Sequence, residues 1–415
     1  MFDQTLPDRK IQKDEKLLSE NKNSPIKRLI EKPVNADCFT SIVIPVRDEA
    51  ELIEKCLAAF TRQIDLKTEK VDPKLFEIII LANNCADNSV EIIEKFRRQN
   101  SHLQIHTAEV FLDEENRNIG FVRKLLMDEA HARLKKNRFG KGVIVTTDGD
   151  TTVADDWICA NLREIESGAD AVGGRIIING AELEKMDALC REFHLKDEEY
   201  RLLAAEIEDL IDELPFDHAP RHHQHFNGSF AVTTEMYEKA GGLPEVKFLE
   251  DIAFFDRLQK MDARIRHSPN VEVFTSSRHV GRSEVGLSFQ LNLWKNLRQE
   301  GEDFLVESAE AIIERFTAKK LLRKIWRNYA KNKKTDGEKI SIAAGKIFVG
   351  GKFISEELKK QKTFGEFYES LMVERNKDGK WLKYFPMVSL DTALDKLKKE
   401  AEKRRRQSFS QTSMR

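Results

Sequence analysis

The chain has 415 residues, of which 40% are hydrophobic and 34% charged. Its formal net charge is only -2, so it lacks the overall positive field that would favour nucleic acid as its main partner. The length exceeds the size at which one hydrophobic core usually stops growing, which predicts a main domain with an additional part.

The start of the chain is polar and charged and has no sustained hydrophobic periodicity, so we expect a flexible arm over residues 1–37. It lacks the apolar core of a signal peptide, and no stretch of the chain approaches the roughly 20 apolar residues that cross a bilayer. The five cysteines are scattered and odd in number, which favours reduced thiols over a disulfide framework. We therefore expect a cytoplasmic protein without a transmembrane segment.

Strand and helix patterns alternate in the first part of the chain. Apolar runs predict strands at 39–46, 76–82, 103–110 and 143–147, and helical spacing predicts helices at 51–63, 90–99 and 121–136. This alternation predicts an α/β fold with a mostly parallel sheet and helices on both faces. Ligands bind beyond the carboxyl ends of such strands, and the polar clusters RDE, NNCADNS and DGD all follow strands there.

Helical patterns dominate later in the chain. We expect helical structure over 181–214, then a histidine-rich turn, and another helix over 312–332, where Lys, Glu and Leu become frequent. A boundary near residue 300 would separate a main domain over 38–298 from a helical region with a basic tail over 299–415. The basic amphipathic helices of that region could dock on the main domain, form an oligomer or contact an anionic membrane surface, and a helical cap with a solvated basic face is favoured.

Two acidic pairs are the strongest candidates for chemistry. Asp148 and Asp150 follow a predicted strand, and two such carboxylates can bind a divalent cation that also takes diphosphate oxygens. Glu250 and Asp251 stand at the expected start of a helix, where a carboxylate could accept a proton from an attacking hydroxyl. Each pair alone also fits a plainer interpretation, as turn chemistry or as a complement to the helix dipole.

Six segments, taken together, resemble the inverting glycosyltransferases of family 2. They are SIVIPVRDE, IIILANNCADNS, VTTDGD, FNGSFAVTTEMYEKAGGLPE, LEDIAFFDRL and VEVFTSSRHVGR, in the family's order over roughly residues 40 to 290. The resemblance implies a GT-A fold, here with a C-terminal α-helical extension. It also implies a hexosyltransferase-type enzyme that moves a sugar from a nucleoside-diphosphate sugar to an acceptor hydroxyl and uses Mg²⁺ or Mn²⁺.

The resemblance implies roles for single residues as well. Asp150 and Asp148 match the metal-binding DxD, and His279 is a candidate third metal ligand. Asp251, beside Glu250, matches the acid proposed as general base. The residues expected to bind the donor nucleotide are Val46, Arg47, Glu49, Asn83, Asn84, Arg123 and Asp148. The residues expected near the acceptor or the diphosphate are His225, Asn227 and Arg282.

Two features leave alternatives open. Asn83 or Asn84 stands where the family often has an acid that reads the base, and because an amide can bond either uracil or guanine, the donor base is not specified. The histidines between His218 and His225 match no standard zinc spacing, so we interpret them as part of a loop beside the acceptor cleft.

Two other functions compete with a transferase. An inactive GT-A-like binding or scaffold protein would have no physical need for both Asp150 and Asp251. A sugar-nucleotide pyrophosphorylase would need a glycine-rich loop with Arg and Lys after the first strand, where this chain has PVRDEAE. The donor sugar, the acceptor and the oligomeric state are not specified by these residues.

Overall fold

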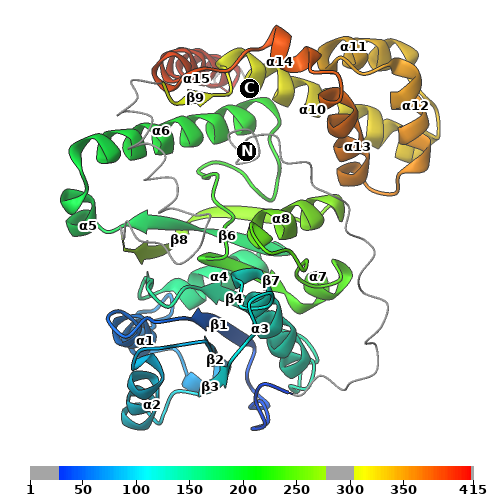
Figure 1. Cartoon of the computed structure of the whole chain (residues 1–415). Coiled ribbons are helices and arrows are strands. Elements are labelled where there is room, and N and C mark those ends of the chain that lie inside the picture. Colours follow the sequence, from blue (N-terminus) through cyan, green and yellow to red (C-terminus); the bar gives the residue numbers. More distant parts are fainter. Residues whose placement is uncertain (1–27, 277–302, 413–415) are drawn as a thin grey trace.

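The computed structural model describes residues 28–276 and 303–412. Within them, one large sheet lies between helices, and a second, mostly helical layer, which also contains the small two-stranded sheet β9-β10, lies along one side of it (Figure 1). The α/β class and the C-terminal helical region that the sequence predicts are both confirmed.

The sheet has eight strands in the order β3-β2-β1-β4-β7-β6-β8-β5. Their bounds are β1 Thr40–Val46, β2 Phe76–Asn83, β3 Ile105–Val110, β4 Val143–Thr147, β5 Thr152–Val153, β6 Ala171–Ile178, β7 Ser229–Thr233 and β8 Ile265–Thr275. The four strands predicted from the first part of the chain, β1 to β4, pair in parallel. β7 runs antiparallel to both of its neighbours, β4 and β6, so the sheet is mixed beyond β4.

Alternation of side chains along β1 explains why helices cover both faces. Ile42 and Ile44 point into one apolar cluster, while Val43, between them, points into the other. The helices over the first face are α1 Ile53–Ala59, α2 Ser89–Gln99 and α4 Trp157–Glu166. The helices over the second face are α3 Ile119–Leu134, α7 Thr234–Lys239 and α8 Glu250–Lys260.

The packed chain begins before the first strand. Ile30 is buried in the same cluster as α3, the backbone N–H of Leu29 donates to Glu129, and Arg133 donates to the carbonyl oxygen of Lys32. The last ten residues of the predicted arm, 28–37, therefore include segments held against α3, and residues 1–27 lie outside the described part.

The helical stretch expected over 181–214 is two helices, α5 Gly180–Lys185 and α6 Ala188–Ile211. Asp187 separates them because its carboxylate accepts hydrogen bonds from the N–H groups of Leu189 and Cys190 and so starts a new helix. The remaining elements are β9 Leu305–Val306, α10 Ala309–Asn332, α11 Gly337–Ile347, α12 Gly351–Lys360, α13 Phe364–Asn376, α14 Lys380–Tyr384, β10 Val388–Ser389 and α15 Leu390–Thr412.

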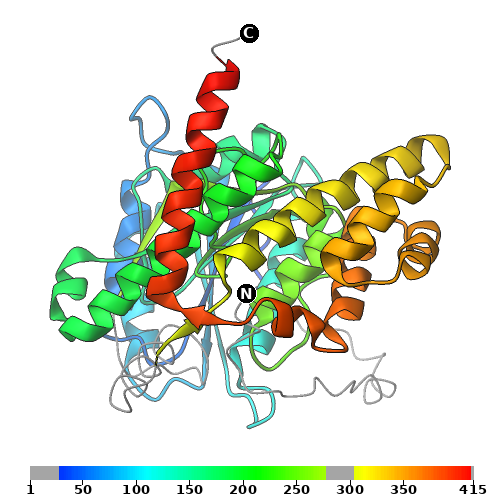
Figure 2. The same cartoon turned by 90° about the horizontal axis from the view of Figure 1, so that it is seen from above.

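Helix α6 belongs to the same apolar core as the C-terminal helices. Its buried side chains pack with those of α10 and α15, and Figure 2 shows α15 lying along α6. Ion pairs reinforce the contact: Lys319 binds Glu208 at 3.0 Å and Arg323 binds Asp212 at 3.1 Å. The C-terminal helices are thus attached to the main domain through a shared hydrophobic core.

A second attachment joins α13 to the end of α8. The carboxylate of Asp262 accepts hydrogen bonds from the N–H groups of Phe364 and Gly365, at 2.9 and 2.8 Å, and so satisfies free donors at the start of α13. A Cβ at Gly365 would lie 1.9 Å from the carbonyl oxygen of Gln259. The two backbones meet so closely that only glycine fits.

None of the helices in the described ranges is both long enough and apolar enough to cross a membrane.

The contact at Gly365 predicts a stability effect. Gly365→Ala should lower the free energy of unfolding by about 1–3 kcal/mol, because the new methyl group must push α13 away from α8. Gly345→Ala, in α11, is the matched control: nothing lies within 4 Å of its Cβ position, and the change should stabilise the helix by up to about 1 kcal/mol. Urea unfolding followed by circular dichroism measures both, and equal effects would contradict the close contact.

Candidate active site

The predicted metal-binding acids lie at the carboxyl end of β4, beside the loop that follows β1. A Cβ at Gly149, between the two acids, would lie 3.2 Å from Val46 and 3.3 Å from Glu49. The structure therefore brings Asp148 and Asp150 next to two of the residues expected to bind the donor nucleotide. This is the strand end at which ligands bind in such sheets.

Arg123, on α3, joins the two acidic pairs. Its guanidinium donates to Asp148 and, at 2.5 Å, to Glu250, the first residue of α8. The Arg123 and Glu250 side chains are only 6% and 5% exposed, and Asn227 lies 3.5 Å from the same Glu250 oxygen. Arg123 is therefore held by two protein carboxylates, one from each acidic pair.

Asp251 follows Glu250 at the sharp start of α8, where Leu249 adopts a left-handed conformation with φ of 56°. Burial, together with the negative charge of Glu250, raises the pKa of Asp251 to about 6, although Arg123 opposes the shift. A carboxylate with a pKa near neutrality accepts protons more strongly than an ordinary aspartate does. This property suits Asp251 to the role of general base.

The oxygen-rich surroundings of Asp150 fit a hard divalent cation. Its carboxylate lies 3.3 Å from the hydroxyl of Thr151 and 3.4 Å from that of Ser276, and the nearby Asp148 side chain is 40% exposed. Mg²⁺ prefers oxygen ligands and is often bound through one or two carboxylates plus substrate phosphates. His279 and Arg282 lie outside the described residues.

The two asparagines after β2 differ in their surroundings. Asn84 exchanges two hydrogen bonds with the backbone of Leu112, at 2.9 and 3.1 Å, and has a positive φ of 49°. Its amide thus ties the end of β2 to the segment after β3. Asn83 is the buried last residue of β2.

Nearby, Asp48 and Asp87 connect the two loops at this edge. Asp48 accepts a hydrogen bond from the N–H of Ala86 at 2.6 Å, and Asp87 accepts one from the N–H of Ala50 at 3.0 Å. Together with Cys85 they are the one group of three metal-ligating atoms found in the described ranges. Their hydrogen bonds to backbone explain their position without a metal.

The histidines of the loop before β7 do not converge on a metal position within the described part of the chain. His222 bonds the carbonyl oxygen of Ser268 and accepts the N–H of Gln224, while His267 bonds Asp217 at 2.8 Å. His225 stacks on Phe255 of α8, with ring centroids 3.6 Å apart. This loop is therefore packed against α8. It lies next to Asn227, which contacts Glu250.

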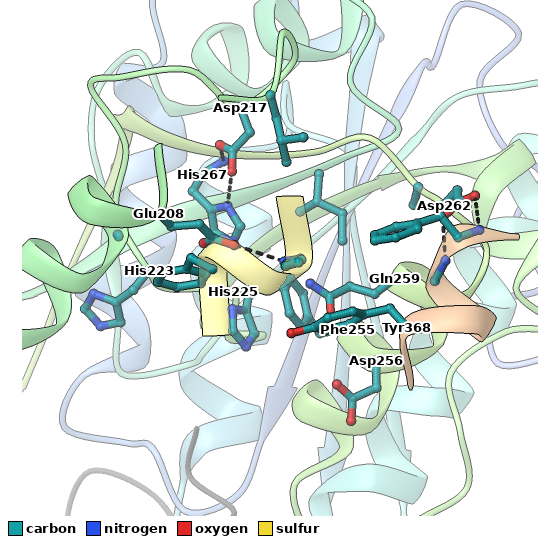
Figure 3. A pocket seen from close by; sticks show the side chains of 18 of the residues that line it. Glu208, Asp217, His223, His225, Phe255, Asp256, Gln259, Asp262, His267 and Tyr368 are labelled. Atoms are coloured by element: carbon teal, nitrogen blue, oxygen red, sulfur yellow. Dashed lines mark hydrogen bonds and ion pairs between the residues drawn. The ribbon is translucent and has the colours of Figure 1, made fainter. Parts of the chain in front are cut away.

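A cavity of about 670 Å³ lies along the outer side of α8 and is closed by the C-terminal helices. Figure 3 shows Glu208, His223, His225 and His267 on one side of it and Gln259, Asp262 and Tyr368 on the other. No local sequence signal marks this cavity, because its walls come from α6, α8, α10 and α13. Only the spacing of Arg315, Lys319, Arg323 and Arg327 along α10 could have suggested a charged face.

The sequence profile described as Glycosyl transferase family 2 matches residues 41–214, which include β1 to β4, Arg123 and the DxD. Residues 41–214 are a glycosyl transferase family 2 domain. The match confirms the family resemblance for this part of the chain. The Arg123 network joins this domain to Glu250, so the candidate site extends beyond the matched residues.

One curated relative is Glycosyltransferase AglE of Haloferax volcanii, which is 26% identical over 139 residues. That match covers 33% of this chain and 39% of the length of AglE. The chain is thus similar to somewhat more than a third of that protein.

Solved structures show a distant likeness. A mannosyltransferase, PcManGT, from Pyrobaculum calidifontis, in complex with GDP-Man and Mn²⁺, has 13% identity and a TM-score of 0.40, covering 86% of this chain and 91% of that one. S. aureus TarS 1–349 in complex with UDP-GlcNAc has 13% identity and a TM-score of 0.40, covering 81% and 89%. At these scores the likeness locates no residue and assigns no substrate.

The buried position of Arg123 predicts a large stability effect. Arg123→Gln should lower the free energy of unfolding by about 3–5 kcal/mol, because Glu250 would keep its buried charge without the partner cation. Arg264→Gln is the matched control. Arg264 also donates two side-chain hydrogen bonds, both to Asp170, but is 52% exposed, so its loss should cost about 0–1 kcal/mol. Chemical unfolding of both variants tests the difference, and similar losses would show that the Arg123 network is unimportant for stability.

Proposed function

We propose that the chain transfers a sugar from a nucleoside-diphosphate sugar to an acceptor hydroxyl, with inversion at the anomeric carbon and with Mg²⁺ or Mn²⁺ as cofactor. The observation that carries the proposal is the Arg123 network, which holds the DxD and the acidic start of α8 in one site. The glycosyl transferase family 2 domain supports the reaction class.

Each residue has a defined task in this reaction. Asp251 takes the proton of the acceptor hydroxyl as the hydroxyl oxygen attacks the anomeric carbon, and the bond to the diphosphate breaks on the opposite side of that carbon. Attack and departure on opposite sides invert the configuration without a covalent enzyme intermediate. Glu250 and Arg123 position Asp251 and Asp148, while the loop containing Val46, Arg47 and Glu49 holds the nucleotide.

The metal would be held by Asp150 together with Asp148, and it would supply positive charge to the diphosphate as that group leaves. Two carboxylates alone would repel a diphosphate, and Arg123, which bonds Asp148, also serves Glu250. A divalent cation would offset the negative charge of these acids and of the diphosphate.

An inactive binding protein is the alternative function. The raised pKa of Asp251 favours an enzyme, because a half-buried acid with a pKa of about 6 is suited to proton transfer near neutral pH. The pyrophosphorylase alternative gains no support, since the loop after β1 carries no glycine-rich phosphate cradle.

Metal-dependent binding of the donor is the first test. Calorimetry with a panel of nucleoside diphosphates should show Mn²⁺-dependent binding of one of them by the wild type, and at least tenfold weaker binding by Asp150→Ala. Asp155→Ala, an exposed acid paired with Arg62, is the control and should bind normally. Tight binding that ignores Mn²⁺ would count against the metal site, and no binding to any nucleoside diphosphate would count against the transferase.

The role of Asp251 predicts a pH profile. Only deprotonated Asp251 can act as base, so kcat/KM should fall tenfold for each pH unit below about 6. Asp251→Asn should lower kcat by roughly 10²–10⁴-fold and leave nucleoside-diphosphate binding within a few-fold of wild type. Steady-state kinetics across pH 4.5–9 measures the profile, and an unchanged kcat in Asp251→Asn would exclude this base.

The same pKa predicts the stability of that variant. The folded-state pKa of about 6 lies above the roughly 3.9 of an unfolded aspartate, so the stability that the protonated carboxyl contributes is full below pH 4 and is lost as the pH rises through 6. Because Asn stays neutral, Asp251→Asn should be more stable than wild type at pH 8, by up to about 2 kcal/mol, and nearly equal to it at pH 4. Thermal unfolding of both proteins at both pH values measures this difference in stability. A variant that is less stable than wild type at pH 8 would contradict the prediction.

A further inference from the structure

The cavity along α8 begins beside the proposed general base. Ile252, the residue after Asp251, lines it, and so does Phe255, one helical turn beyond Asp251 on the same face of α8. His225 and Phe226 also line the cavity. They directly precede Asn227, whose side chain contacts Glu250. A molecule in this cavity would therefore reach the site from the side of α8 that carries Asp251.

One wall of the cavity is a row of cations. Helix α10 places Arg315, Lys319, Arg323 and Arg327 at every fourth position, and all four line the cavity. The first three side chains are only 19%, 17% and 16% exposed. Long cationic side chains on a solvated helix face keep their charged ends in water, so this row is not an ordinary solvent-exposed face.

The acids that line the cavity do not cancel this charge, and two cations of the row pair with acids outside the lining: Arg315 with Glu307 at 2.9 Å and Arg323 with Asp212 at 3.1 Å. Seven lysines and arginines line the cavity against five aspartates and glutamates, which leaves a net charge of +2. Glu208 is shared by two cations, Arg221 at 3.2 Å and Lys319 at 3.0 Å. Arg327, at the exposed end of the row, has no ion-pair partner among the described residues.

Titratable groups in the walls respond to this positive charge. Burial by itself would raise the pKa of Glu208, but Lys319 and Arg221 lower it to about 2. Burial lowers the pKa of His223 and His225, and the nearby Arg201 and His267 act in the same direction. The histidines are therefore neutral donors or acceptors at pH 7, and the anion-binding capacity comes from the arginines and lysines.

The cavity also has the size and the aromatic surfaces of a small-molecule site. Its volume of about 670 Å³ falls within the range of about 300–1,000 Å³ that is typical of such sites. The stacked rings of His225 and Phe255 line it, and so does Tyr368 of α13. Rings of this kind cover the apolar face of a small organic molecule while charged groups fix its orientation.

We propose that this cavity is the acceptor subsite and that the acceptor is a small hydroxylated molecule carrying a carboxylate or a phosphate group. The inference rests on the proposed glycosyl transfer, in which a hydroxyl must reach Asp251. The acceptor's anionic group binds the α10 cations, and its hydroxyl points along α8 toward Asp251. The C-terminal helices thereby determine which acceptors are used.

The test compares acceptors that differ only in charge. The full chain, saturated with the nucleoside-diphosphate sugar whose base the calorimetry identifies, is offered glucose, glucose 6-phosphate and glucuronic acid, and glycerol, glycerol 3-phosphate and glycerate. We expect at least tenfold higher kcat/KM for the anionic members, and comparison of the phosphate with the carboxylate members tells which anion is preferred. Neutral members used as well as the anionic ones would overturn the proposal.

Variants of α10 assign the effect to the cavity. Lys319→Gln and Arg327→Glu should raise KM for the anionic acceptor about tenfold, with little change in kcat and in nucleoside-diphosphate binding. Lys324→Gln, on an exposed position of the same helix, is the control and should behave as wild type. Because Lys319 also binds Glu208, the exposed Arg327 provides a variant that keeps the fold.

The outcomes separate the two proposals. Normal nucleoside-diphosphate binding with an unchanged KM in both α10 variants would overturn the acceptor subsite and leave the transferase intact. Loss of all nucleoside-diphosphate binding in the wild type would overturn the transferase and the acceptor subsite with it.

Discussion

The arrangement of the candidate site depends on one buried cation, Arg123. It is held between Asp148, at the end of β4, and Glu250, at the start of α8, with its side chain only 6% exposed. Glu250 is just as buried and would be costly to ionise without a partner. Because Arg123 neutralises Glu250, α8 can begin with two adjacent acids, and burial with the charge of Glu250 raises the pKa of Asp251 to about 6.

This dependence explains which parts of the site were visible in the sequence. Asp148, Asp150 and Asp251 could be predicted because each sits beside a local pattern, a buried strand or a helix start. The Arg123 contacts could not, since they join residues 25 and 127 positions apart. Asn84 illustrates the same limit: its partner, Leu112, follows a different strand, so its side chain looked available to a ligand when read from sequence alone.

The fold divides in the same way. The strands of the first 150 residues were predictable because their apolar runs end at polar turns, and β1 to β4 follow that pattern. The break between α5 and α6 depends on one capping aspartate, Asp187, within an otherwise continuous helical pattern. The packing of α6 against the C-terminal helices could not be predicted in this way. Hydrophobic periodicity shows which face of a helix is apolar, but it does not show which other helix covers that face.

The distribution of charge gives the helical region a place in the proposed reaction. At the strand ends the protein offers carboxylates, so an anionic donor would need a divalent cation to bind there. Along α10 the protein itself offers the cations, so an anionic acceptor would need none. Two negatively charged substrates would thereby bind on different sides of Asp251, at the start of α8. The close contact at Gly365 joins α13 to α8 and the shared core joins α6 to α10, so the packing of the helical region would fix where an acceptor lies relative to that base.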